Sequence, residues 1–165
     1  MGLQPNRGGF PPNRGGYQNQ GANRPQGGRP EIPPLNTTDI DLCPAEGKAL
    51  NPNLFDGIAQ RVAKDINESD RFANKPAQIR QFYDELVMWE EKARQNPERF
   101  ADYLPFIRML NAKAAYAEGR KHVNRTFVDF MAHGLKQVQD PDSLRNFKLF
   151  FEAFLGFYKA ERPSG

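Results

Sequence analysis

The feature that most constrains the fold is a helix-start signal that recurs along the chain from residue 51 onward. An Asn or Asp side chain accepts hydrogen bonds from the free amides of a first helical turn, and a proline within that turn loses no helical hydrogen bond. The combination occurs at Asn51-Pro52, Asn74-Lys75-Pro76, Asn96-Pro97 and Asp140-Pro141. Four helix starts are therefore predicted, and Asn124, after a break at 119–123, is expected to begin a fifth helix.

These starts predict helices near 52–69, 76–95, 97–120, 124–138 and 141–160. Apolar residues at steps of three and four mark a core-facing stripe in the second and third of them. The stripes are Ile79, Phe82, Leu86, Trp89 and Ala93, then Ile107, Leu110, Ala114 and Ala117. Pro105 falls inside the third helix, which it either kinks or splits. Because no alternating β-branched run has strand length, the predicted fold class is all-α, a compact five-helix bundle.

The last segment, 141–160, carries aromatic and aliphatic side chains around most of its circumference. A helix with this pattern is buried nearly all round. We expect it at the centre of the bundle, with one edge left for a partner. The alternative is that part of its aromatic surface docks another chain.

The chain before residue 51 has a different composition. Residues 1–35 repeat an Arg-Gly-Gly-aromatic unit with few aliphatic side chains, so this tail is expected to be disordered. It is either a solubilising arm or, through guanidinium charge and ring stacking, an RNA contact. Residues 36–50 are expected to form an extended, solvated connector, since Asp39 and Asp41 have no third metal ligand nearby. The bundle would then span 51–162.

Charge is unevenly distributed along the sequence. The net charge is +3, and residues 1–30 hold four arginines and no acid, so subtracting four from +3 leaves −1 for the rest. A cationic surface on the folded part must therefore be a local patch.

One cysteine, Cys43, cannot form an internal disulfide, and no apolar run approaches the roughly 20 residues of a membrane span. We expect a cytoplasmic protein that makes no membrane contact.

The inventory of reactive side chains argues against an enzyme. His122 and His133 are too far apart in sequence for the i, i+4 spacing that lets one helix face hold a metal. The adjacent acids of 84–85 and 90–91 point in different directions around a helix, and no phosphate-binding or nucleophile motif occurs. We expect no catalytic residue, no metal and no cofactor.

Basic residues of the second and third helices are the candidate nucleic-acid site. Lys113, Arg120 and Lys121 share one side of a helix at i, i+7 and i+8. Lys75 and Arg80 lie at a helix N-terminus, where an anion is favoured and a cation is not. The alternative is that Arg120 and Lys121 only answer the negative end of the third helix.

Three blocks of sequence carry a family resemblance. They are Gln78–Asp84 (QIRQFYD), Leu104–Ala117 (LPFIRMLNAKAAYA) and Asn146–Tyr158 (NFKLFFEAFLGFY). In this order they closely resemble blocks of the small subunit of type III-A CRISPR effector (Csm) complexes. The resemblance covers about 74–160 and leaves residues 1 to about 50 outside the match.

The resemblance implies a five-helix protein that stacks in several copies and binds RNA without cutting it. Its implied partners are CRISPR RNA, target RNA, the backbone and large subunits, and other copies of itself. Arg80 and Lys113 fall within matching blocks, and Arg120 and Lys121 lie just beyond the second block. The sequence departs from the family at two positions: where the family often has Thr and a second cation, this chain has Ala77 and Gln81. The hypothesis is that one groove, continued by the neighbouring copy, is lined by Lys75, Arg80, Lys113, Arg120 and Lys121, with Arg108 ranked lower. The alternative is a free-standing helical adaptor whose Arg-Gly-Gly tail binds RNA.

Overall fold

A computed structural model describes residues 2, 8–9 and 31–162, so most of the predicted 1–35 tail lies outside the described residues. The chain divides into Met1–Glu31 and Ile32–Gly165, and the helices within 31–162 all belong to the second unit. They are η1 (Pro52–Phe55), α1 (Gly57–Ser69), α2 (Pro76–Gln95), η2 (Pro97–Arg99), α3 (Phe100–Arg108), α4 (Leu110–Gly119), α5 (Arg125–Gln137) and α6 (Pro141–Glu161). No strand occurs within 31–162, and the all-α prediction is confirmed.

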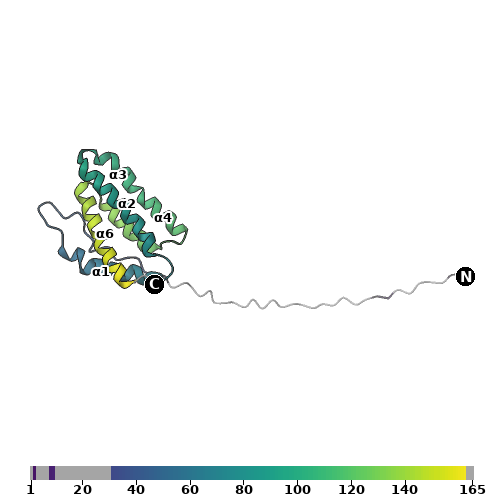
Figure 1. Ribbon diagram of the computed structural model, residues 1–165. Coiled ribbons are helices and arrows are strands. Elements are labelled where there is room, and N and C mark those ends of the chain that lie inside the picture. Colours follow the sequence, from purple (N-terminus) through teal and green to yellow (C-terminus); the bar gives the residue numbers. More distant parts are fainter. Residues whose placement is uncertain (1, 3–7, 10–30, 163–165) are drawn as a thin grey trace. The chain divides into compact units, whose positions relative to one another are not determined.

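Helix α6 packs its aromatic face into the core, but it is not buried nearly all round as its apolar pattern predicted, because Leu149, Leu155 and Phe157 are only half-buried. It packs against α1, α2 and α5 (Figure 1). Its buried side chains are Ser143, Leu144, Phe147, Phe150, Phe151, Phe154 and Tyr158. Phe130 of α5 packs edge-on against Phe151, with ring centroids 5.1 Å apart, and also lies 4.8 Å from Phe154. This aromatic cluster forms the centre of the core because each ring buries a large apolar area.

Five helical segments occur where five were predicted, but the third is divided. Pro105 stands inside α3, and the interruption comes one turn later, at Met109, between α3 and α4. The Met109 amide still donates to Pro105 O at 3.1 Å, and the Lys113 amide to Met109 O at 3.1 Å. The helical phase therefore continues across the break, so α3 and α4 keep common faces.

The predicted helix starts differ in how they are capped. The side chains of Asn51, Asn124 and Asp140 each accept a hydrogen bond from a first-turn amide, as expected. Asn96 stands at the expected start without a side-chain cap bond. Asn74 does not cap α2, which begins at Pro76, because its side chain is committed to a long-range pairing described below.

The predicted connector, 36–50, contains no helix or strand but is not simply solvated. Ile40 and Leu42 are buried in the core, as is Leu35 just before them. Gln137 of α5 fixes the segment, since its side chain accepts from the Leu42 amide at 2.7 Å and donates to Ile40 O at 3.0 Å. The packed unit therefore begins well before residue 51. Alternating apolar residues within a short polar stretch gave too weak a signal to predict this.

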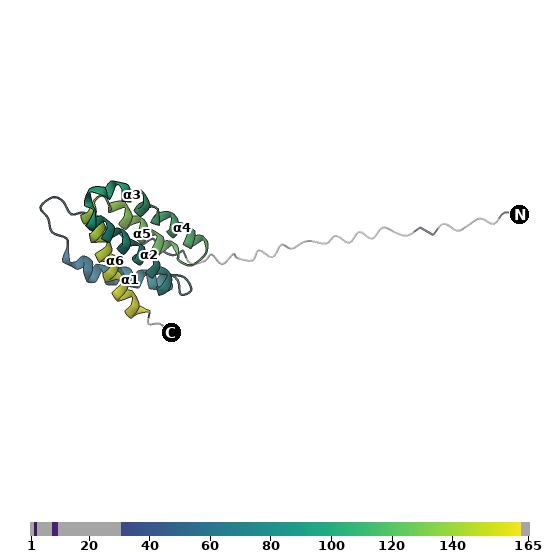
Figure 2. The ribbon, with the colours of Figure 1, turned by 45° about the horizontal axis from the view of Figure 1, so that its top comes forward.

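Helix α2 lies between α6 and α4 in two views of the bundle (Figures 1 and 2). Its Ile79, Phe82 and Leu86 are buried in the core, and Arg80, Gln81 and Asp84 on its outer side are exposed. Among the described residues, no helix is both long enough and apolar enough to cross a membrane.

Candidate nucleic-acid interface

Two loops meet at one end of the bundle through a buried pair of asparagines. Asn74 precedes α2, and Asn124 caps α5. The Asn74 amide nitrogen Nδ2 donates to Asn124 Oδ1 at 2.8 Å, and the Asn124 backbone N–H donates to Asn74 Oδ1 at 2.9 Å. The Asn74 backbone N–H also donates to His122 O at 2.9 Å. Buried polar groups satisfied in this way hold a single arrangement, so the two loops are fixed to each other.

The asparagine pair brings three of the predicted cations to the same end of the bundle. Lys75 follows Asn74 directly, and Arg120 and Lys121 precede His122 in the other loop. All three are exposed, and within 31–162 none forms an ion pair with a carboxylate. Lys121 adopts the left-handed backbone conformation, with φ of 61°, which closes the turn after α4. We call Lys75, Arg120 and Lys121 the cationic rim.

A shallow groove runs from this rim between α2 and α4, with a volume of about 220 Å³. It is lined by Gln78, Gln81, Phe82, Glu85, Lys113, Tyr116, Ala117 and His122. Each member of the rim lies within three residues of one of these positions. Amides, a lysine and exposed aromatic surface are the groups that contact phosphate, sugar and base in protein–RNA interfaces.

Lys113 is the only predicted cation among the residues that line this groove, and it is already paired. Its Nζ lies 2.5 Å from Glu85 Oε1, and the lysine side chain is half exposed. The pair joins α4 to α2 across the groove. An exposed pair of this kind adds about 1 kcal/mol or less, so a phosphate can compete for the ammonium group.

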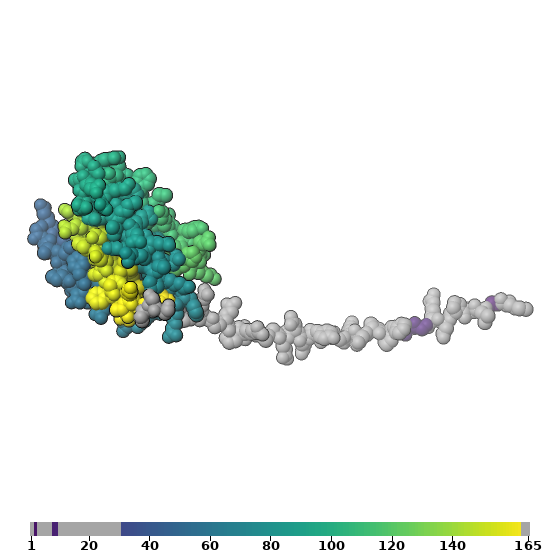
Figure 3. Space-filling model, in the orientation of Figure 1, coloured from purple at the N-terminus to yellow at the C-terminus, as the bar shows by residue number. Residues whose placement is uncertain are grey.

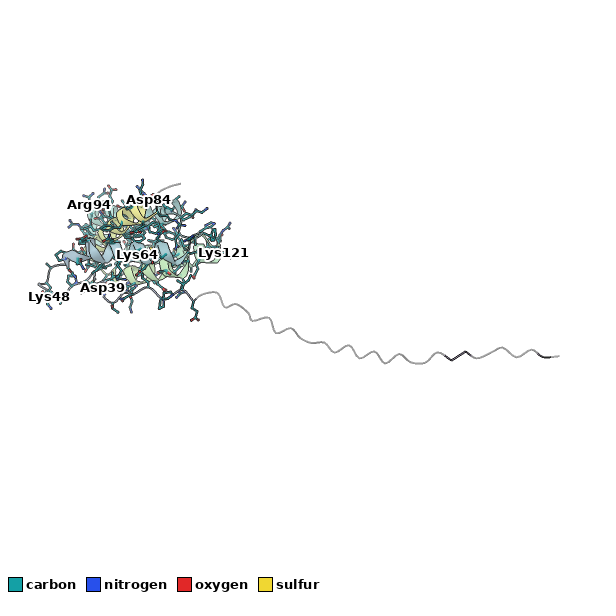
Figure 4. All side chains as sticks on the ribbon, turned by 90° about the horizontal axis from the view of Figure 1, so that it is seen from below. Asp39, Lys48, Lys64, Asp84, Arg94 and Lys121 are labelled. Carbon is teal, nitrogen blue, oxygen red and sulfur yellow. The ribbon has the colours of Figure 1, made fainter. Side chains whose placement is uncertain are left out.

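Arg80 lies on another side of α2 and does not line the groove. It donates to Asp84 at 3.1 Å and lies 5.8 Å from the centre of the Tyr83 ring. It borders a separate hollow between α2 and α6, two helices that lie side by side on one face in Figure 3. Five residues separate Arg80 from Glu85, which is about 140° around a helix of 3.6 residues per turn. Figure 4 accordingly shows Asp84 and Lys121 in separate places.

Arg108 has a structural bond of its own. Its guanidinium donates to Val138 O at 2.9 Å, tying α3 to the end of α5. Within one chain the cations of the hypothesis are therefore divided: Lys113 lines the groove, Lys75, Arg120 and Lys121 lie within three residues of its lining, and Arg80 and Arg108 lie elsewhere. Sequence reasoning missed Tyr116, although its place between Lys113 and Arg120 at i+3 and i−4 was a usable signal.

The two histidines lie in different places. His122 is the histidine of the groove, and its neighbour Glu85 is engaged by Lys113. His133 lies in α5, with Nε2 2.8 Å from Ile40 O. In the part of the chain that the structure describes, no three His, Cys, Asp or Glu side chains gather as metal ligands.

Comparison with known proteins identifies a family. The family model described as Csm2 Type III-A matches residues 49–164, which include α1–α6, the rim and the groove. No curated protein and no solved structure matches.

Proposed function

This chain belongs to the Csm2 Type III-A family, the small subunits of type III-A CRISPR effector complexes, and we propose that it holds RNA there without cutting it. The α2–α4 groove and its cationic rim are the proposed contact surface. The proposed ligand is the CRISPR RNA paired with its target, and specificity comes from base pairing with the guide. Lysine and arginine contacts to phosphate position a strand without reading its sequence.

The observation that carries this proposal is the cationic rim held in place by the Asn74–Asn124 pair. Three cations without carboxylate partners in 31–162 lie on fixed loops, although the chain beyond residue 30 has a negative net charge. Helix α2 starts beside them with no acid in its first turn and no side-chain cap, so its positive end is also available to an anion. These features together favour a phosphate backbone.

We further propose that several copies stack along the complex, in contact with its backbone and large subunits. Binding at one copy would then be weak, and repetition along the assembly would raise the overall affinity. The half-buried Leu155 and Phe157 leave an edge of α6 for such contacts, and Phe72 is 87% exposed. We propose no catalytic role for this subunit and place it in the cytoplasm with its partners.

Charge reversal of the rim tests the RNA contact. Changing Lys75, Arg120 and Lys121 to Glu should lower the retention of target RNA by the assembled complex by at least about 100-fold, because each lost phosphate contact weakens binding and flattens its salt dependence. Helicity should be unchanged. The matched control reverses Lys48, Lys64 and Arg94, which Figure 4 places apart from Lys121 and which change the net charge equally. Equal retention by both triple variants would refute the assignment of the rim.

Single charge reversals of Arg80 and Lys113 distinguish the two sides of α2. Because Arg80 faces the hollow beside α6, Arg80→Glu should affect RNA retention less than Lys113→Glu. A larger loss for Arg80→Glu would place the RNA on the α2–α6 side instead. Both variants are assayed at the same salt concentration, since binding to phosphates depends steeply on it.

The free-standing adaptor with an RNA-binding tail remains the competing function. It is distinguished by deleting residues 1–30 and not 1–35, since Leu35 is part of the core. Our proposal expects most RNA binding to survive this deletion, and the adaptor expects it to disappear. Metal-dependent loss of RNA in the presence of the isolated chain would favour a third class, a nuclease.

A further inference from the structure

Helices α3 and α4 share an exposed face that carries apolar side chains at one end and a tyrosine between two cations at the other. Its members follow steps of three and four, and they are Phe106, Met109, Lys113, Tyr116 and Arg120. The face is continuous because the helical hydrogen bonds at Met109 and Lys113 carry the same phase across the break. It lies beside the buried stripe of Ile107, Leu110, Ala114 and Ala117, so packing does not explain it.

Tyr116 is the most exposed large apolar side chain on this face, at 66%, compared with 55% for Phe106 and 53% for Met109. Its hydroxyl accepts a hydrogen bond from Arg120 at 3.2 Å, and the Arg120 guanidinium lies 5.8 Å from the ring centre. The ring lines the groove together with Lys113. An aromatic ring held at the lip of a groove between two cations presents a flat surface to a ligand that carries both a π face and negative charge.

We infer that Tyr116 is a stacking platform for an unpaired RNA base, with Lys113 and Arg120 contacting the phosphates on either side of that nucleotide. This inference rests on the proposed RNA-binding function and narrows it: the paired guide and target contact the cationic rim through their phosphates, and the nucleotide beside Tyr116 is one that is not paired. A base inside a duplex has both faces covered by its neighbours, so only an unstacked base can use the ring. The cations at i−3 and i+4 lie on the same helix face as the ring, where adjacent phosphates of one strand can reach them.

A protein partner would use this face differently. The apolar part of the face lies at its other end, where Phe106 stacks on Trp89 with ring centroids 5.8 Å apart and Met109 is exposed nearby in sequence. A docked protein would be expected to bury that end. Tyr116, with a cation on each side, is the section whose charge complements a nucleic acid.

The experiment uses the full chain and a short single-stranded RNA that carries 2-aminopurine at an internal position. Stacking on an aromatic ring changes the fluorescence of this base. If Tyr116 only supported the fold, its replacement would not alter that fluorescence change. The RNA is titrated at low salt against the wild type, Tyr116→Phe and Tyr116→Leu. A second RNA has abasic sites in place of its central bases, and a third is a blunt duplex.

Tyr116→Phe keeps the ring and should bind within about twofold of the wild type. Tyr116→Leu should bind the single strand roughly tenfold more weakly and lose the fluorescence change, since one stacked base adds about 1–3 kcal/mol to binding. Its affinity for the abasic strand and the duplex should change less than twofold, and its salt dependence should stay that of the wild type. Equal fluorescence changes in the wild type and Tyr116→Leu would overturn the inference.

The two proposals fail in different ways. If Tyr116→Leu behaves as the wild type while Lys113→Glu and Arg120→Glu lose binding, the RNA contact stands and the stacking platform falls. If the wild type binds none of the three RNAs and the assembled complex retains target RNA equally well with the rim reversed, both proposals fall. If Tyr116→Leu weakens the duplex and the single strand equally, the ring supports the helix surface and does not stack on a base.

Discussion

The close contact between α5 and α6 at Gly134 predicts that alanine at this position destabilises the protein, although alanine in place of glycine inside a helix usually stabilises it. A Cβ atom added at Gly134 of α5 would lie 2.2 Å from Cε2 and 2.4 Å from Cζ of Phe147 in α6. Carbon atoms pack at roughly 3.5–4.0 Å, so the ring would have to move by more than about 1 Å. Phe147 is fully buried, with the rings of Phe130 and Phe151 centred 5.9 and 6.0 Å away, which leaves it no room to move.

The magnitude follows from two opposing contributions. Overpacking of a close-packed core costs about 1–3 kcal/mol, and the constrained ring puts this site at the upper end. Alanine in place of glycine inside a helix returns about 1 kcal/mol. Gly134→Ala should therefore lower the free energy of unfolding by about 2 kcal/mol, which corresponds to a decrease in Tm of roughly 8 °C for a domain of this size.

Urea unfolding followed by circular dichroism at 222 nm measures the effect, and Gly156→Ala is the control. Gly156 also lies inside a helix, α6, but nothing lies within 4 Å of its added Cβ. Gly156→Ala should stabilise the protein by about 0.5–1 kcal/mol. Phe147→Leu removes the ring that the added Cβ would contact. The double variant Gly134→Ala/Phe147→Leu should therefore be at least about 1 kcal/mol more stable than Gly134→Ala alone. A Gly134→Ala variant as stable as the wild type would refute this account of the α5–α6 contact.

Three further perturbations concern the loops and the ends of the bundle. Asn74→Ala should lower the free energy of unfolding, measured in urea, by about 3 kcal/mol. It leaves the buried backbone N–H of Asn124 without its acceptor, and it puts alanine, which has no side-chain hydrogen bond to compensate, at a φ of 58°. A loss below about 1 kcal/mol would contradict the role of the pair. Burial raises the pKa of Tyr158 above its ordinary 10.0, so the folded state favours the neutral phenol, and this stability is present below pH 10 and lost as pH rises through the folded-state pKa. Urea midpoints between pH 7 and 11 should therefore fall at the alkaline end, and less so in Tyr158→Phe; identical alkaline slopes would count against it. Burial, followed by the charge of Asp140, raises the pKa of the Cys43 thiol above 9.0, so alkylation at pH 8 should be several-fold slower than for a free thiol, and a rate equal to that of free cysteine would contradict this.

Most of the helical architecture could be predicted from local sequence. The signals at Asn51, Asn124 and Asp140 are short-range, because the cap and the amide it binds lie within three residues of each other. Asn74 carried the same signal, but its side chain binds a partner 50 residues away. Such a tertiary contact leaves no local trace, so the sequence could predict a helix start near Asn74 but not what the asparagine does.

The candidate site was predicted less completely than the fold. Arg80 and Lys113 both lie in the matching sequence blocks, but a block does not say which side of α2 faces which neighbour. That depends on how α2 is rotated between α4 and α6, which the buried Ile79, Phe82 and Leu86 decide together. The cationic rim likewise required knowledge of which two loops meet. Tyr116 could have been predicted from the sequence, since aromatic and basic residues at steps of three and four are visible in the printed chain.

The central position of α6 has a consequence for how the subunit is made. Along the chain α6 is the last of the helices in 31–162, so α1, α2 and α5 leave the ribosome before the helix that packs against them. Until Phe147, Phe151 and Phe154 emerge, the nascent chain cannot close its core, and the apolar side chains that these rings cover stay exposed to solvent. A product truncated before α6 would be removed by proteolysis instead of persisting as a shortened subunit. Only finished subunits would then be available for the assembly.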